Sequence, residues 1–473
     1  MDARSLTIPL AVLVMACDPP AGTPTPPEAT LTPAASTAQA TLPPTAPEAT
    51  DGPTAAATQP PPAPTPSPTA TAPEPTEALP VTWYRDVEPL VARTCQRCHV
   101  EGGVAPRPFT TYEDTAPLAS IMAAYVGARL MPPPAPDPAC APYEGSERMV
   151  LSEAERQVFA DWAGAGAPAG HPSTSPGAPS PPAALADPDL VLYPAVGHAP
   201  SFDAGGNDYH CFVLETGLTE DTFITGFDAL PDRADVVHHM VLFKDKNGDA
   251  GASQGSPADG FRCYDMEGDW QFVAAWAPGA GPLLFDGEVG LPLAATDQLV
   301  LQMHYYRSTP GAGLDADKSG YALKTARRVR RELQMVEFGP TNFTIPAGEA
   351  SHQIVYAWTA PEDFEVGLDI YAVGPHMHLL GTSYRGWLTH PGGDEECVVA
   401  SDGWDFSNQG VYRLGRPAQV RPGDTITWSC TWDNSVANPN QLNFPPIDVG
   451  YGLGTDDEMC FVFSYSAIVP LAP

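Results

Sequence analysis

The sequence predicts a small all-α domain followed by one or two all-β sandwiches. Helix-like patterns fall within residues 81–170, whereas residues 187–473 contain strand-like runs separated by Gly, Pro, Asn and Asp turns. Two segments rich in Pro and Ala, residues 18–80 and 171–186, mark the ends of the helical region. A chain of 473 residues has room for several domains of roughly 100–200 residues each.

The first 17 residues have the pattern of a bacterial lipoprotein signal peptide. Arg4 precedes a short apolar run that ends in Val-Met-Ala-Cys17, and this run is too short to span a bilayer as a helix. We therefore expect export to the periplasmic or outer-surface side of a bacterial membrane, with a lipid anchor on Cys17. A plain signal peptide with an incidental cysteine is the alternative, because Met15 is unusual two residues before a lipidated cysteine.

Residues 18–80 are expected to form a disordered tether. They are nearly all Pro, Thr, Ala, Ser and Glu, without Lys, Arg or an aromatic residue, so they cannot bury enough apolar surface to offset the chain entropy. The whole chain has a net charge of -34, which argues against nucleic acid or an anionic lipid surface as a partner. The membrane contact is then expected only through the lipid anchor.

The helical block, residues 81–170, is expected to contain three helices, at residues 83–94, 116–130 and 152–163. Ser152 is the expected N-cap of the third, because acidic residues fill the first turn after it. Residues 171–186 then form a linker to the strand-rich region.

A haem-attachment motif lies near the start of this block. Cys95-Gln-Arg-Cys98-His99 has the C-x-x-C-H spacing in which two thiols form thioether bonds to haem and the following imidazole binds the iron. A redox C-x-x-C pair normally lies in a βαβ unit, and a zinc site needs two further ligands nearby. Neither context is apparent, so we predict covalent haem c and a cytochrome c domain at residues 81–170.

Met131 is the predicted sixth ligand of that iron. Three prolines follow it and stiffen its loop, as in small class I cytochromes, and thioether ligation raises the reduction potential. Met122 and Met149 are the alternatives, although their helical spacing favours core positions.

Five histidines lie in strand contexts of the second region, whose strand-like runs are residues 234–243, 298–306, 366–373 and 425–431. His376 and His378 are two residues apart, so on a strand they share one face and could chelate one metal. His238 and His239 are adjacent and point to opposite faces of a regular strand, so joint ligation needs a bulge or a strand end. His304 lies in a third apolar run. The other histidines of this region are expected to be surface or structural residues: His198, His210, His352 and His390.

The ligand types favour copper. Imidazole suits copper, zinc and iron, whereas a thioether ligand favours Cu(I). Two His with a Met therefore indicate a copper that cycles through its reduced state and meets O2. Met459 is a candidate for that Met, although spacing alone does not select it.

Six short segments, in order, resemble the copper type II monooxygenases, the family of peptidylglycine α-hydroxylating monooxygenase and dopamine β-monooxygenase. The matching segments are Asp208-Tyr-His-Cys211, Asp235-Val-Val-His-His-Met240, Val300-Leu-Gln-Met-His304-Tyr305, His376-Met-His378-Leu-Leu-Gly381, Cys430-Thr-Trp-Asp-Asn434 and Asp457-Glu-Met459-Cys460. Each segment alone is a weak signal, but six in the family's order are specific.

The resemblance implies two jelly-roll sandwiches, residues 187–333 and 334–473, each holding one copper. The implied ligands of an electron-transfer copper are His238, His239 and His304. Those of the copper where O2 and substrate react are His376, His378 and Met459. The resemblance also implies two disulfides, Cys211–Cys263 and Cys430–Cys460. Cys140 and Cys397 have no family partner, and the sequence leaves their pairing open; a bond between them across the two modules is one option.

The substrate-binding pattern differs from that of peptidylglycine-cleaving enzymes. Those enzymes hold a substrate carboxylate with an Arg two residues before the His-x-His pair, helped by an Asn and a Tyr after the Met. Here the three positions are Gly374, Phe461 and Phe463. Because a buried carboxylate without a cationic partner is costly, we expect a neutral or apolar organic C–H substrate.

Monooxygenation consumes O2 and two electrons from outside the substrate. In the resembled enzymes ascorbate supplies them. Here we expect the fused haem to deliver them singly to the three-His copper, with ascorbate, another reductant or a donor protein as the source. Electron flow from copper to haem is the alternative, because a Met-ligated haem has a high potential and is a mild donor. Linkage in one chain would raise the effective concentration of donor and acceptor.

Two alternatives to a monooxygenase are a non-catalytic electron-transfer or copper-binding lipoprotein, and a carbohydrate- or protein-binding scaffold that carries a cytochrome.

Overall fold

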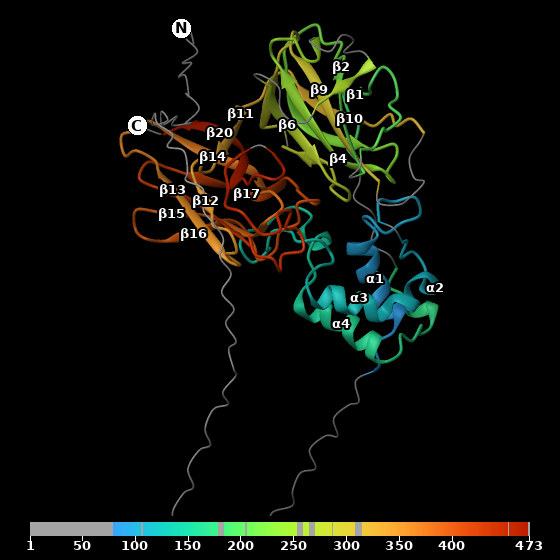
Figure 1. Ribbon diagram of the computed structural model, residues 1–473. Coiled ribbons are helices and arrows are strands. Elements are labelled where there is room, and N and C mark those ends of the chain that lie inside the picture. Colours follow the sequence, from blue (N-terminus) through green and yellow to red (C-terminus); the bar gives the residue numbers. More distant parts are fainter. Residues whose placement is uncertain are drawn as a thin grey trace, which may run out of the picture. The chain divides into compact units, whose positions relative to one another are not determined.

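The computed structural model divides the chain into two compact units, Met1–Thr76 and Glu77–Pro473. The described residues all belong to the second unit (Figure 1), and they are 79–105, 107–177, 184–203, 206–252, 259–263, 270–285, 287–307, 315–452 and 454–471. The predicted signal peptide, Cys17 and almost all of the predicted tether lie outside these residues. Across the described ranges, no helix has both the length and the apolar character needed to cross a membrane.

Helices occupy the region where the sequence predicts them. The first is α1 (Glu88–Leu90), extended by helical turns on both sides so that residues 83–95 are helical throughout. The others are α2 (Tyr112–Thr115), α3 (Ala119–Gly127) and α4 (Glu153–Gly164), with single turns at Ala116–Leu118, Ser146–Arg148 and Pro172–Thr174. The second predicted helix therefore ends about three residues earlier than expected, at Gly127.

The N-terminus of α4 confirms the predicted cap. The Ser152 hydroxyl accepts a hydrogen bond from the Glu155 amide at 3.3 Å, and the Glu155 carboxylate accepts one from the Ser152 amide at 2.8 Å. This reciprocal pair satisfies two amides that the helix leaves free. Behind it, Trp83 and Trp162 pack with ring centroids 5.6 Å apart in a core that also buries Met122.

The first sandwich contains ten strands in two layers. The sheet that carries the histidines has the order β5-β2-β9-β4-β6, and the facing strands have the order β1-β10-β3-β8, with β7 beside β3. Apolar side chains from both layers form one core. The bounds are β1 (Leu190–Leu192), β2 (Asn207–Leu214), β3 (Thr222–Leu230), β4 (Val237–Asp245), β5 (Phe261–Arg262), β6 (Gln271–Trp276), β7 (Leu283–Leu284), β8 (Val289–Leu293), β9 (Gln298–Tyr306) and β10 (Gly320–Ala326).

The second sandwich packs the strands β11-β20-β14-β17 against the sheet β13-β18-β15-β16, with the short pair β12-β19 beside them. Strands β4, β9, β14 and β18 correspond to the four predicted runs. The bounds are β11 (Arg331–Phe338), β12 (Thr344–Ile345), β13 (His352–Thr359), β14 (Val366–His376), β15 (Gly381–Thr389), β16 (Glu395–Ser401), β17 (Tyr412–Val420), β18 (Thr425–Trp432), β19 (Val449–Gly450) and β20 (Phe461–Pro470).

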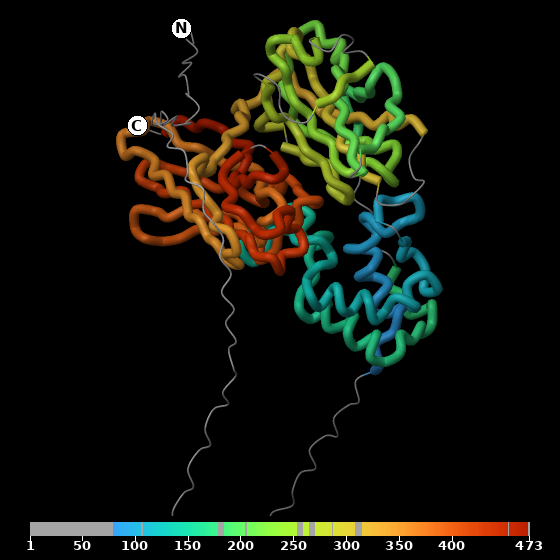
Figure 2. The backbone as a smooth tube through the Cα atoms, viewed as in Figure 1, coloured from blue at the N-terminus to red at the C-terminus, as the bar shows by residue number. Residues whose placement is uncertain are grey.

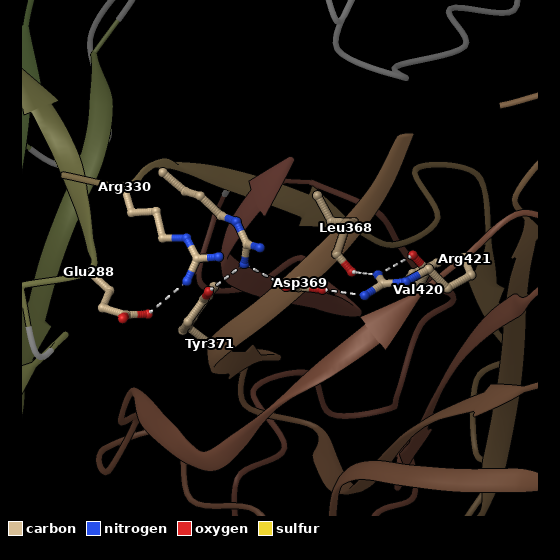
Figure 3. Close-up of polar contacts among 8 residues, drawn as sticks. Glu288, Arg330, Leu368, Asp369, Tyr371, Val420 and Arg421 are labelled. Atoms are coloured by element: carbon tan, nitrogen blue, oxygen red, sulfur yellow. Dashed lines mark hydrogen bonds and ion pairs between the residues drawn. The ribbon is translucent and has the colours of Figure 1, made fainter. Parts of the chain in front are cut away.

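One sheet runs through both sandwiches. Strand β11 pairs in parallel with β8 at Arg331 and Glu332 and then antiparallel with β20. The boundary drawn from the sequence at 333/334 therefore falls inside β11. Close to this joint, the buried Asp369 carboxylate receives Arg331 at 3.1 Å and Arg421 at 2.8 Å (Figure 3).

We expect Asp369→Ala to lower the free energy of unfolding by about 2–4 kcal/mol, because it leaves two partly buried guanidinium groups without their shared carboxylate. The matched control is Glu288→Ala, which breaks an exposed pair with Arg330 at 3.9 Å. The Glu288→Ala change should lower the free energy of unfolding by less than about 1 kcal/mol. Urea unfolding of both variants and the wild type measures the difference. Equal effects from the two substitutions would contradict a structural role for the joint.

Three disulfides are present: Cys140–Cys397, Cys211–Cys263 and Cys430–Cys460. The two pairings that the resemblance implies are confirmed, and the third bond joins the two cysteines whose pairing the sequence left open. That pair joins residues 137–144, which follow α3, to β16 of the second sandwich.

Residues 137–144 pack as part of the second sandwich rather than with the helices, which the sequence analysis did not predict. Tyr143 is buried in the core of that sandwich and its hydroxyl donates to the Val398 carbonyl at 3.1 Å. The Asp137 amide also donates to the Ala400 carbonyl at 2.8 Å. Figure 2 shows this teal part of the chain beside the red strands.

Candidate metal centres

Three histidines meet on two neighbouring strands of the first sandwich. His239 on β4 lies opposite His304 on β9, and the register between the strands skips one residue after Val237, so His238 is the extra residue of a bulge. The bulge lets adjacent side chains share one side of the sheet. This is the condition that the sequence analysis set for His238 and His239 to act together.

Their ring nitrogens converge on one point. The Nδ1 atoms of His238 and His239 are 3.3 Å apart, as are those of His239 and His304. Each histidine offers one nitrogen to a metal, and these three nitrogens all lie within 4.8 Å of one another. Among the described residues, no other group of three His, Cys, Asp or Glu side chains has this geometry. Imidazole nitrogens in this arrangement suit copper or zinc.

The surroundings keep these imidazoles neutral and oriented. Burial, with a smaller effect of the neighbouring histidines, lowers the pKa of His304 to about 2 and that of His239 to about 3. The Asn207 side-chain oxygen lies 2.9 Å from Nε2 of His304. Because that oxygen only accepts, Nε2 carries the proton and the Nδ1 lone pair faces the cluster.

A second pair of histidines lies at the end of β14 in the second sandwich. The rings of His376 and His378 have centroids 5.1 Å apart and are almost perpendicular. The Nδ1 atom of His376 is 2.5 Å from the Gln409 side-chain oxygen, and that of His378 is 3.0 Å from the Asp457 carbonyl oxygen. Both rings therefore donate from Nδ1, so Nε2 is the nitrogen that carries no proton. Burial lowers the pKa of His376 to about 4, which keeps it neutral as well.

The segment that carries Met459 is held against His378. The Glu458 carboxylate accepts hydrogen bonds from the His378 amide at 2.9 Å and the Leu380 amide at 2.6 Å, and Asp457 contacts the His378 ring. Met459 is buried, and the next residue forms the disulfide to β18. Burial raises the pKa of Glu458 to about 7. The residues just before Met459 are therefore fixed against His378, and the role of Met459 as a copper ligand stays a prediction.

Aromatic side chains surround this second site. The Phe463 ring centroid is 5.7 Å from that of His376, and Phe461 stacks on Phe463 at 6.4 Å. Gly374 lies opposite Phe463 in the ladder between β14 and β20. The three positions that depart from the carboxylate-binding pattern thus lie beside the site.

The predicted haem-attachment residues form one tight turn. The Cys98 and His99 amides both donate to the Cys95 carbonyl, at 3.1 and 2.9 Å. The Nδ1 atom of His99 donates to the Arg107 carbonyl at 2.8 Å, which leaves Nε2 free for iron. Both cysteines are free thiols in the described part of the chain.

The chemistry of the thiols favours attachment over redox exchange. Burial raises the pKa of Cys95 to about 11 and also raises that of Cys98. A redox-active pair needs a lowered thiol pKa, so this motif is unlike one. A cavity of about 260 Å³ lies beside Cys98. The turn and the imidazole nitrogen left for iron fit covalent haem attachment, whereas neither Cys95 nor His99 lines the cavity.

Met131 does not line that cavity, and its side chain is 39% exposed. Its role as an iron ligand stays a prediction. Of the alternatives, Met122 is buried among the helices and Met149 borders the cavity and packs against the second sandwich.

Sequence reasoning missed three residues that hold the ligands in place. Asn207 and Gln409 occupy unremarkable positions and act only through contacts with distant segments. Glu458 lies within the quoted Asp-Glu-Met-Cys segment, and an acid next to a predicted ligand was the one available signal.

Comparison with known proteins agrees with this geometry. Residues 199–310 match the N-terminal domain of the copper type II ascorbate-dependent monooxygenases, and residues 333–468 match their C-terminal domain. The two segments together make up just over half of the chain.

Several curated hydroxylases are similar to the same region. Dopamine beta-hydroxylase of Canis lupus familiaris is 28% identical over 48% of this chain and 37% of its own length. Tyramine beta-hydroxylase of Caenorhabditis briggsae is 24% identical over 56% of this chain and 43% of its own length. DBH-like monooxygenase protein 1 of Homo sapiens is 26% identical over 48% of this chain and 38% of its own length. The chain thus spans less than half the length of these relatives.

The solved cowpea mosaic virus capsid overlaps with a TM-score of 0.22 at 8% identity, over 59% of this chain and 88% of that one, which is too slight to define a relationship.

The two domain matches, in order and over the residues that form the histidine sites, are specific. The chain therefore belongs to the copper type II ascorbate-dependent monooxygenase family.

Proposed function

We propose that the protein is an exported copper-dependent monooxygenase that hydroxylates a C–H bond of a neutral organic substrate with O2. The observation that carries the proposal is the pair of ligand sets, one in each sandwich. The three-His cluster of the first sandwich would hold one copper, and His376, His378 and Met459 would hold the other. When bound, copper supplies one-electron redox chemistry and a binding position for O2.

The two ligand sets suit different tasks. Three converging imidazoles, with the Nδ1 lone pair of His304 fixed by Asn207, make the first site suited to electron transfer. At the second site, His376 and His378 would bind through Nε2 and Met459 would add a thioether, a ligand that favours the reduced metal that reacts with O2. The outer partners, such as Asn207 and Gln409, fix the ring tautomers in both cases.

A neutral substrate is supported by the side chains around His376. Phe461 and Phe463 stand where peptidylglycine-cleaving enzymes use polar groups, and Gly374 stands where they use an Arg. Phe406 adds an aromatic edge 6.0 Å from the His378 ring. These residues favour an apolar organic molecule over a carboxylate, because an unpaired charge is costly to bury.

We further propose that a haem held by Cys95, Cys98 and His99 serves as the electron relay. Contacts with the first sandwich support this. The Cys98 sulfur lies 3.6 Å from the Pro278 carbonyl oxygen, two residues beyond the end of β6, and β6 pairs with the strand β4 that carries His239. Haem supplies single electrons at this end of the sandwich when it is bound.

The contact beside Cys98 is closely fitted. The Arg97 side chain donates to the Gly279 carbonyl at 2.8 Å. Gly279 has a positive φ of 86°, and a Cβ there would come within 2.8 Å of the Arg97 side chain, so the turn needs glycine. Export and lipid anchoring through Cys17 remain part of the proposal, resting on the signal-like pattern of the first 17 residues.

The test is O2 uptake by the full-length, copper-loaded protein under a reductant, with a set of neutral aromatic and aliphatic substrates. We expect uptake to match hydroxylated product one to one, and Met459→Ile to lose it. If the reductant reduces the copper and the haem but no substrate yields a hydroxylated product, the alternative is favoured, a non-catalytic electron-transfer or copper-binding lipoprotein.

A further inference from the structure

The side chain of Gln409 is fixed at both of its polar atoms. It lies in the segment between β16 and β17, residues 402–411, which we call the bridging loop. Its Nε2 donates to the Phe406 carbonyl at 3.0 Å, so its Oε1 is the atom that faces His376, 2.5 Å from Nδ1. An amide that donates from one end has only its oxygen to offer at the other.

This arrangement decides the state of the His376 ring. Because Oε1 can only accept, Nδ1 of His376 carries the proton and Nε2 keeps its lone pair. A neutral imidazole binds a metal through its unprotonated nitrogen, and the partner of the other nitrogen sets both the tautomer and the ring orientation. The His376 ring is therefore held ready for a metal at Nε2.

Other residues of the bridging loop contact the second histidine of the pair. The Trp404 ring nitrogen donates to the His378 carbonyl at 2.9 Å, and the Phe406 ring meets the His378 ring edge-on. Asn408 and Gly410, on either side of Gln409, line the cavity beside Cys98. The loop thus packs on the histidine pair, and two of its residues border the cavity next to the haem motif.

We propose that Gln409 is a positioning residue for the second copper, which it serves by holding His376 in the tautomer and orientation that direct Nε2 to the metal. The proposal rests on the proposed function, since it needs a copper at this site. It assigns a role to a loop residue outside every quoted family segment.

The test compares Gln409→Ala with Gln409→Glu in the full-length protein. Loss of an outer hydrogen-bond partner costs about 10–100-fold in metal affinity. We expect Gln409→Ala to weaken Cu(I) binding at one of two sites by that factor, measured by chelator competition, and to change one of two Cu(II) paramagnetic resonance signals. Gln409→Glu should recover most of the copper affinity that Gln409→Ala loses, because a carboxylate oxygen accepts the same hydrogen bond even though the donation to the Phe406 carbonyl is lost.

Gln353→Ala is the matched control, because Gln353 is an exposed residue of β13 in the same sandwich. It should leave both coppers unchanged. Wild-type affinity and an unchanged resonance spectrum in Gln409→Ala would overturn the proposal. If Gln409→Ala fails to fold, Gln409→Met decides, because it keeps the side-chain length without the accepting oxygen: weakened copper binding at one site supports the role, and wild-type binding overturns it.

Failure of this proposal differs from failure of the proposed function. A wild-type protein that holds no copper, or that holds copper without consuming O2 in product formation, contradicts the function itself. If the wild type binds copper and forms product with O2, and the Gln409→Ala variant binds copper as tightly as the wild type, only the role of Gln409 is contradicted.

Discussion

Replacing His304 by alanine should remove the copper of the first sandwich and lower turnover by more than about 100-fold, since loss of a ligand exceeds the effect of losing an outer partner. His304 provides one of three converging Nδ1 atoms, and its other nitrogen is already engaged by Asn207. The remaining two histidines would be a weaker site. Copper content and product formation under a reductant measure the two effects.

The control is His352→Ala, which removes a histidine of β13 outside both clusters. It should keep both coppers and wild-type turnover. The expected role of His304 would be contradicted if the His304→Ala protein still held two coppers, or if it lost one copper and kept full turnover.

The paired change Cys95→Ser with Cys98→Ser should abolish covalent haem attachment, because no thiol remains to form a thioether bond. We expect turnover to disappear with donors that reduce only the haem. It should persist with a small reductant such as ascorbate that can reach copper directly. Turnover with haem-specific donors, measured beside turnover with ascorbate, separates the two routes.

A second change tests the axial ligand within the same experiment. Met131→Ala should keep the haem covalently attached but alter its absorption spectrum and lower its reduction potential, since thioether ligation raises that potential. An unchanged spectrum would assign the sixth position to another residue. Retention of covalent haem in the double Cys variant would refute the attachment motif.

The sequence was most informative where function depends on short local patterns. The C-x-x-C-H turn, the Ser152 cap and the strands that carry the histidines follow from spacing alone. The bulge at His238 could be stated only as a condition, because periodicity does not reveal where a strand gains a residue. The resemblance supplied Met459, which spacing did not select.

What the sequence could not predict depends on contacts between distant segments. Residues 137–144 look like part of the helical block but are buried in the second sandwich, where Tyr143 contacts a strand more than 250 residues later. The parallel pairing of β8 with β11 likewise joins two sandwiches through one sheet. Gln409 belongs to the same class, since only the folded chain brings it to His376.

The most direct measurement of the central claim is the copper and haem content of the full-length protein after maturation in a bacterial periplasm, compared with Met459→Ile. We expect two coppers and one covalent haem per chain in the wild type. In the variant, one copper should be firmly held and the haem retained, because only the thioether ligand has changed. A wild type that holds haem but no copper, or a Met459→Ile variant that binds copper as the wild type does, would contradict the monooxygenase assignment.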